Sequence, residues 1–158
     1  MGSGFGVKCN TCNASWEGTL GIGMLYAPDR INEALSDPKG TTNLIRSKSI
    51  KNEIANILNH HGLLTEYEHS SYICSSCNWI YDRFFVNILT FSKEGNYTPK
   101  YKCTKCKKPL IRVDMEIKEN GVKLFDGVGN RIPWHCPKCK GTHLVEDNDS
   151  RMNGLCWD

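Results

Sequence analysis

The sequence contains no apolar run that approaches the roughly 20 residues needed to span a bilayer. It also has no basic region followed by an apolar stretch and a small-residue cleavage site, which is the pattern of a secretory signal. Apolar residues make up 39% of the chain, slightly less than in an average globular domain. We therefore expect a soluble protein that resides in the cytoplasm and does not contact a membrane.

The residue patterns of common zinc enzymes and redox proteins are missing as well. No histidine is followed two residues later by glutamate, as it is in the zinc nucleobase deaminases. A thioredoxin-like protein needs one C-x-x-C motif at the mouth of a βαβ unit, whereas this chain carries its motifs in strand-rich contexts. We therefore expect no catalytic residues and no enzymatic activity.

Cysteine is abundant, and its spacing is informative. Eight of the nine cysteines form C-x-x-C pairs, and only Cys156 stands alone. Nine cysteines would suit a disulfide scaffold in a secreted protein, but in a reducing cytosol pairs at this spacing are more often metal ligands. Iron or an iron–sulfur cluster remains an alternative to zinc, since thiolates select poorly among these metals. The pairs are Cys9/Cys12, Cys74/Cys77, Cys103/Cys106 and Cys136/Cys139.

Two C-x-x-C turns together supply the four ligands of a tetrahedral Zn²⁺ site. The spacer between the last two pairs is the size of a loop and hairpin. The spacer between the first two pairs is much longer, but the cost of loop closure grows only slowly with length. We therefore expect two zinc ions per chain and pairing in chain order, with nested or interleaved pairings left open. The expected first site is Cys9, Cys12, Cys74 and Cys77, and the second is Cys103, Cys106, Cys136 and Cys139.

The pattern along the chain predicts a small, metal-stabilised α+β fold with two zinc-ribbon-like β sub-domains. Residues 1–95 are expected to form the first, with a helical insertion at about 28–62, and residues 96–158 the second with a C-terminal tail. Sub-domains of this size usually need a metal to stay folded.

Two helices are expected within the insertion. Pro28 is a suitable start for a short helix, and Ser47 or Ser49 could cap a second helix that Gly62 ends. Strands are expected over 16–26, 79–91 and 110–117 and near Leu144.

A basic stretch surrounds the third C-x-x-C pair. The formal charge of the chain is +3 with every thiol neutral, but each zinc–tetrathiolate site carries −2, so two sites bring the charge to −1. The basic side chains could therefore contact phosphates, with Tyr97 and Tyr101 stacking on bases, or they could offset the charge of the zinc site. The stretch comprises Lys100, Lys102, Lys105, Lys107, Lys108 and Arg112, of which all but Lys100 are the candidate nucleic-acid-binding residues.

The chain resembles a group of small uncharacterised Firmicutes proteins with several C-x-x-C zinc-ribbon knuckles. The similar segments are Phe5-Gly6, the knuckles themselves, Leu20-Gly21-Ile22-Gly23-Met24-Leu25-Tyr26 and the terminal Trp157-Asp158. Members often carry glycine after the second cysteine of a knuckle, where this chain has Asn13, Asn78, Lys107 and Lys140. The resemblance implies zinc binding and no particular activity.

These features favour a non-catalytic zinc-binding interaction module with a protein partner. The alternative is a nucleic-acid-binding or transcription-associated zinc ribbon that uses the basic stretch from Lys100 to Arg112.

Overall fold

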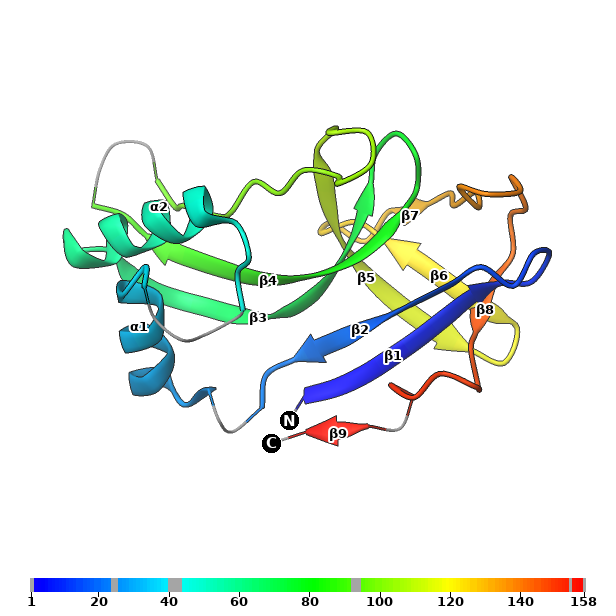
Figure 1. Cartoon of the computed structure of the whole chain (residues 1–158), viewed down its shortest axis with the longest axis horizontal. Coiled ribbons are helices and arrows are strands. Elements are labelled where there is room, and N and C mark those ends of the chain that lie inside the picture. The colour runs from blue at the N-terminus through cyan, green and yellow to red at the C-terminus, as the bar shows by residue number, and fades with distance from the viewer. Residues whose placement is uncertain (1, 24–25, 40–43, 92–94, 154, 158) are drawn as a thin grey trace.

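The computed structural model describes residues 2–23, 26–39, 44–91, 95–153 and 155–157, which form a largely antiparallel sheet with two helices (Figure 1). The helices are α1 (Pro28–Ser36) and α2 (Lys48–Asn59). The strands are β1 (Gly2–Cys9), β2 (Ser15–Gly21), β3 (Leu63–Cys74), β4 (Ile80–Leu89), β5 (Leu110–Lys118), β6 (Gly121–Phe125), β7 (Arg131–Ile132), β8 (Leu144–Glu146) and β9 (Cys156–Trp157).

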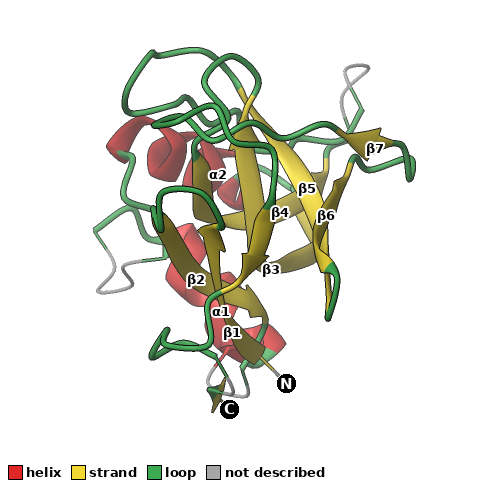
Figure 2. Ribbon diagram, turned by 90° about the vertical axis from the view of Figure 1, so that its right-hand side faces the viewer, coloured by secondary structure: helices red, strands yellow, loops and turns green. Residues whose placement is uncertain are grey.

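The described strands follow the order β7-β6-β5-β3-β2-β1-β8, with β4 paired to β3 and β9 paired to β1. A single residue pair, Gly21 with His69, connects β2 to β3. Within the described residues, the β1–β2 and β3–β4 parts of the sheet are therefore joined by strand pairing only at this residue pair, and away from it their strands run apart (Figure 1, Figure 2). The small α+β class predicted from the sequence is confirmed in this outline.

The two helices lie where the sequence predicts them. Pro28 occupies the first turn of α1, and the Ser47 hydroxyl accepts a hydrogen bond from the Ile50 amide at the start of α2. The end of α2 differs from the prediction, because His61 and not Gly62 takes the left-handed conformation, with φ of 73°. Gly62 instead allows close packing, since a Cβ there would lie 2.7 Å from Ile57 Cγ2. Within the described residues, neither helix is long and apolar enough to cross a bilayer.

The predicted strands are confirmed for β4, β5 and β8, whereas the strand expected over 16–26 ends at Gly21. Met24 and Leu25 of that prediction lie outside the described residues. Strands β1, β3, β6, β7 and β9 were not expected from the sequence.

Two hydrophobic cores stabilise the fold. The first core lies between the strands and includes Phe5, Trp16, Ile73 and Ile80. The second core lies under the helices and is made of the following buried side chains: Ile31, Leu35, Ile45, Ile50, Ile54, Tyr72, Phe84, Val86, Ile88 and Tyr101. Strands β3 and β4 contribute to both cores, so they form the centre of the molecule.

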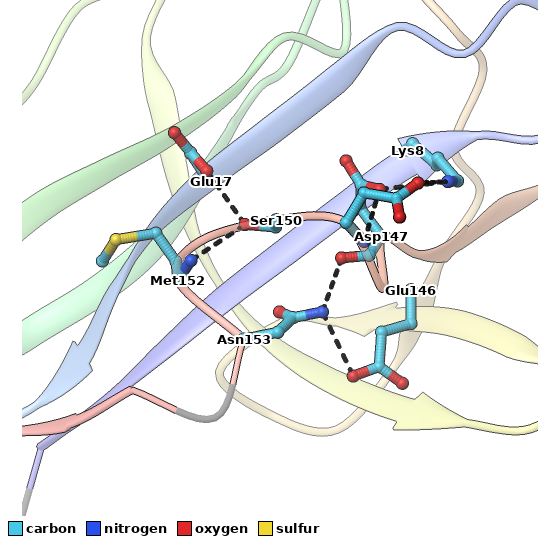
Figure 3. A network of polar contacts seen from close by, with 8 residues as sticks. Lys8, Glu17, Glu146, Asp147, Ser150, Met152 and Asn153 are labelled. Carbon is cyan, nitrogen blue, oxygen red and sulfur yellow. Dashed lines mark hydrogen bonds and ion pairs between the residues drawn. The ribbon is translucent and has the colours of Figure 1, made fainter.

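The C-terminal tail crosses β1 and is held there by polar contacts (Figure 3). Lys8 Nζ lies 3.0 Å from a carboxylate oxygen of Asp147, and the Ser150 hydroxyl donates to Glu17 at 2.9 Å. The tail comes so close that a Cβ on Gly4 would lie 2.1 Å from the Met152 carbonyl oxygen. Glycines in β1 therefore make room for the tail, and β9 brings the chain back beside the start of β1.

Candidate metal centres

The four C-x-x-C motifs fold into the same knuckle. In each, the amide of the residue after the second cysteine donates to the carbonyl of the first cysteine, at 2.9–3.1 Å. The amide of the first cysteine donates to the carbonyl two residues after the second, at 2.7–3.0 Å. The residue after the second cysteine has a left-handed φ between 55° and 64° at Asn13, Asn78, Lys107 and Lys140. These non-glycine residues thus adopt the backbone conformation that glycine adopts most easily.

The knuckles pair in a nested order. The terminal cluster, as we name it, joins the first and fourth knuckles, and the central cluster joins the second and third. The expected pairing in chain order is therefore wrong, because the knuckles on either side of the helical insertion belong to different clusters. The terminal cluster is Cys9, Cys12, Cys136 and Cys139, and the central cluster is Cys74, Cys77, Cys103 and Cys106.

Strand pairing explains the nested order. Strand β1 ends at the first knuckle and pairs with β8, in a register that places Cys9 opposite Leu144. Strand β3 ends at the second knuckle and pairs with β5, which places Cys74 opposite Leu110. Each cluster consequently takes one knuckle from residues 1–95 and the other from residues 96–158.

The spacing of the sulfur atoms fits a tetrahedral metal ion. Within each cluster all four sulfurs lie within 4.8 Å of one another. Sulfurs of facing knuckles lie 3.6 Å apart in the terminal cluster and 3.3–3.8 Å apart in the central cluster. A Zn–S bond of about 2.3 Å in a regular tetrahedron gives sulfur separations of about 3.8 Å. The sulfurs are too far apart for disulfides, and the cysteines are free thiols.

Backbone amides favour the thiolate form of one cysteine in each cluster. Burial raises the pKa of Cys9, but the amides of Cys12 and Thr11 outweigh it and bring this pKa to about 6. Burial likewise raises the pKa of Cys103, while the Tyr81 hydroxyl and the Cys106 amide bring it down to about 6. The thiolate is the form that binds a metal, so one cysteine in each cluster favours the ligand form before a metal binds. Burial raises the pKa of Cys77 to about 12, so the thiols of one cluster differ.

The Tyr81 hydroxyl is a contact that sequence reasoning missed. It lies 3.1 Å from Cys103 Sγ and 3.1 Å from the Thr104 hydroxyl. No local pattern marks it, because β4 brings it to a knuckle 22 residues further along the chain.

Three tryptophans connect the two clusters. Trp16 follows the first knuckle and makes edge-to-face contacts with Trp79 and Trp134, at centroid distances of 5.9 and 5.6 Å. The Trp134 indole N–H donates to the carbonyl of Asn78 at 3.0 Å. The terminal and central clusters are thus joined through a packed aromatic group.

The predicted basic stretch divides into parts with different surroundings. Arg112 forms an ion pair with Glu68, and its guanidinium lies 3.8 Å from the centroid of the Phe85 ring. Lys105 Nζ lies 5.1 Å from the centroid of the Trp79 ring.

The other lysines of the stretch are exposed. Lys107 Nζ donates to the Thr104 carbonyl at 3.1 Å, on the knuckle that carries Cys103. Lys102 and Lys108 are also exposed on either side of this knuckle. The lysines therefore surround the central cluster, whereas Arg112 is bound to β3.

Two other residues that could bind a metal lie outside the clusters. His135 is exposed beside the fourth knuckle and is not among the grouped ligands, so this cluster has four cysteines and no histidine. Cys156 is exposed in β9, and it too is outside both groups. The described residues thus hold two sets of four thiols that are suited to two metal ions.

Comparison with protein-family models, curated proteins and solved structures gives no match.

Proposed function

We propose that this chain binds two zinc ions and acts as a non-catalytic interaction module for a protein partner. The observation that supports the proposal is the pair of closed four-cysteine clusters built from one repeated knuckle. Four thiolates occupy every position of a tetrahedral ion and leave none for water or substrate, which is the arrangement of structural zinc sites. Zinc bound there supplies structural cross-links between strands.

Zinc suits the donor set because it accepts four soft thiolates without a geometric preference of its own. Each loaded cluster carries a charge of −2, and the lysines around the central cluster reduce the cost of that charge. The loaded chain is close to neutral, which agrees better with a protein partner than with a polyanion.

Native mass spectrometry of the purified chain tests the metal part of this proposal. We expect two zinc ions per chain, and one ion after replacement of Cys12 or Cys106 by serine. A chain that folds without metal, or that carries iron in place of zinc, would contradict the assignment. Affinity capture with the loaded chain, compared with the chelated chain, tests the partner part, since a real partner depends on the metal-stabilised fold.

A nucleic-acid-binding zinc ribbon is the second candidate, and the exposed lysines around the central cluster favour it. Binding to generic DNA and RNA, measured over a range of salt concentrations, distinguishes the two functions. A steep salt dependence that is lost when Lys105, Lys107 and Lys108 are replaced by alanine would support the second candidate. Salt-independent or absent binding supports the protein partner.

A further inference from the structure

The surface around the four knuckles contains no acidic residue. We name it the knuckle face, and it is formed by residues 9–15, 74–79, 102–109 and 131–143. All 17 acidic residues of the chain lie outside these ranges. The acidic and basic residues of this chain are therefore unevenly distributed, although their totals nearly balance.

Seven exposed cations lie on the knuckle face, and none forms an ion pair with a carboxylate within the described residues. Two zinc–tetrathiolate clusters together carry −4, so seven cations leave the loaded face with a formal charge of +3. The loaded chain as a whole carries −1, so the rest of the chain carries −4. The cations therefore exceed the number that would balance the clusters. They are Lys102, Lys105, Lys107, Lys108, Arg131, Lys138 and Lys140.

The cations of the third and fourth knuckles belong to one continuous part of the molecule. Lys105 Nζ lies 5.1 Å from the centroid of the Trp79 ring. Trp79 belongs to the packed group of three tryptophans, and Trp134 of the same group lies two residues before Cys136. The knuckle before β5 and the segment before β8 both lie along the upper side of the molecule in Figure 1.

The knuckle face offers few apolar contacts to a ligand. Two of the three tryptophans are only 6–7% exposed, and Lys105 covers one face of the third. Protein interfaces usually depend on a few aromatic or apolar anchors, and single-stranded nucleic acids on exposed aromatic rings. The face favours neither kind of ligand. The large apolar side chains that are exposed in the described residues all lie elsewhere: Leu63, Phe91, Ile111, Val128 and Leu155.

Uncharged hydrogen-bonding side chains lie between the cations. Lysine, arginine, serine, threonine and asparagine are the side chains that contact phosphate oxygens in complexes with nucleic acids. Contacts of this kind position a duplex but do not read its bases. The composition of the face therefore matches a row of phosphates. The exposed uncharged side chains are Asn10, Thr11, Asn13, Ser75, Ser76, Thr104 and Thr142.

We propose that the knuckle face binds the phosphate backbone of double-stranded nucleic acid without reading its bases. The inference rests on the second candidate function and specifies its surface, which extends from the third knuckle to the fourth. A protein partner of the interaction module then binds elsewhere on the chain.

Fluorescence anisotropy with the zinc-loaded chain and a short labelled DNA duplex, over a range of salt concentrations, tests the face. The fourth-knuckle variant combines Arg131→Gln with Lys138→Gln. We expect this variant to lower the slope of log affinity against log salt concentration by about 2, because each phosphate contact contributes about 1. The matched control combines Arg30→Gln with Lys48→Gln, which are exposed on α1 and α2. The control should bind like the wild type.

A third variant separates the face from the candidate function on which it rests. Lys105→Gln combined with Lys108→Gln should lower the salt slope as much as the fourth-knuckle variant does. If only this third variant weakens binding, the proposed face is wrong while the second candidate function stands. If no salt-dependent binding is found, both fail and the protein partner remains.

Other ligands provide further outcomes that would overturn the inference. Tighter binding to oligothymidylate would mean that the face stacks bases, and tighter binding to phosphatidylglycerol vesicles would mean that it recognises lipid headgroups. Equal weakening by the control variant would mean that the charge of the whole chain decides. Zinc content and thermal unfolding of all variants should match the wild type, because every replaced side chain is exposed.

Discussion

The terminal and central clusters use the same knuckle but join parts of the chain at very different separations. Facing cysteines are 124 and 130 residues apart in the terminal cluster, and 26 and 32 apart in the central cluster. The central cluster closes a local unit around β3, β4 and β5, whereas the terminal cluster ties β1 to the last third of the chain. The local knuckle therefore determines how a site is built, and strand pairing determines which knuckles meet.

The largest difference should follow from removing one ligand of each cluster. A structural zinc site contributes on the order of 10 kcal/mol, so Cys77→Ser and Cys139→Ser should both destabilise the chain strongly. Because β3 and β4 contribute to both cores, Cys77→Ser should unfold α2 and β4, while Cys139→Ser should leave them protected. Hydrogen exchange on the zinc-treated variants measures this, and equal loss of protection would mean that the clusters are energetically equivalent.

Trp16 provides a way to test the connection between the clusters. The ring is 7% exposed, so Trp16→Ala should lower the free energy of unfolding by about 3–5 kcal/mol. Its indole nitrogen is buried without a hydrogen-bond partner in the described residues, so Trp16→Phe loses no hydrogen bond and should cost less. Urea unfolding compares the variants. If Trp16→Ala weakened zinc binding at only one cluster, the aromatic group would not couple them.

The Tyr81 hydroxyl should make the central cluster hold its metal more tightly. Outer-shell hydrogen bonds to metal ligands typically change affinity by about 10- to 100-fold, so Tyr81→Phe should release zinc from this cluster about tenfold faster. Among the described residues no tyrosine contacts the terminal cluster, so this cluster serves as the control in the same sample. Chelation followed by mass-spectrometric mapping of alkylated cysteines identifies the cluster that opens. Unchanged release from the central cluster would show that the contact has no effect on the metal.

The smallest effect concerns the left-handed residue of each knuckle. Lysine in this conformation costs roughly 1–2 kcal/mol, and glycine removes this cost. Glycine also increases the conformational entropy of the unfolded chain, which cancels part of the gain in stability. Lys107→Gly and Lys140→Gly should therefore each stabilise the protein by about 0.5–1 kcal/mol, and Asn13→Gly by less, since asparagine tolerates this conformation. Urea unfolding measures the gains. A gain at Lys107 without one at Lys140 would show that the two knuckles differ in strain.

Local features were predictable from the sequence, and long-range pairing was not. The four knuckles and both helices follow from short-range spacing, capping and periodicity. Strand β1 was missed because Gly2, Gly4 and Gly6 disfavour a strand, and contact with the distant tail explains two of these glycines. The pairing of the knuckles depends on which strands are neighbours, and identical C-x-x-C turns contain no information on that choice.

Nested pairing also sets the order in which the ribosome delivers the ligands. Both halves of the central cluster are synthesised before Cys136 is made, so this cluster can close before the terminal one. Cys12 must wait for a partner 124 residues downstream, roughly 6–25 s at ordinary elongation rates. During that interval Cys9 and Cys12 have no partner knuckle. In the nascent chain these two thiols are therefore exposed to oxidants or competing metals for longer than those of the central cluster.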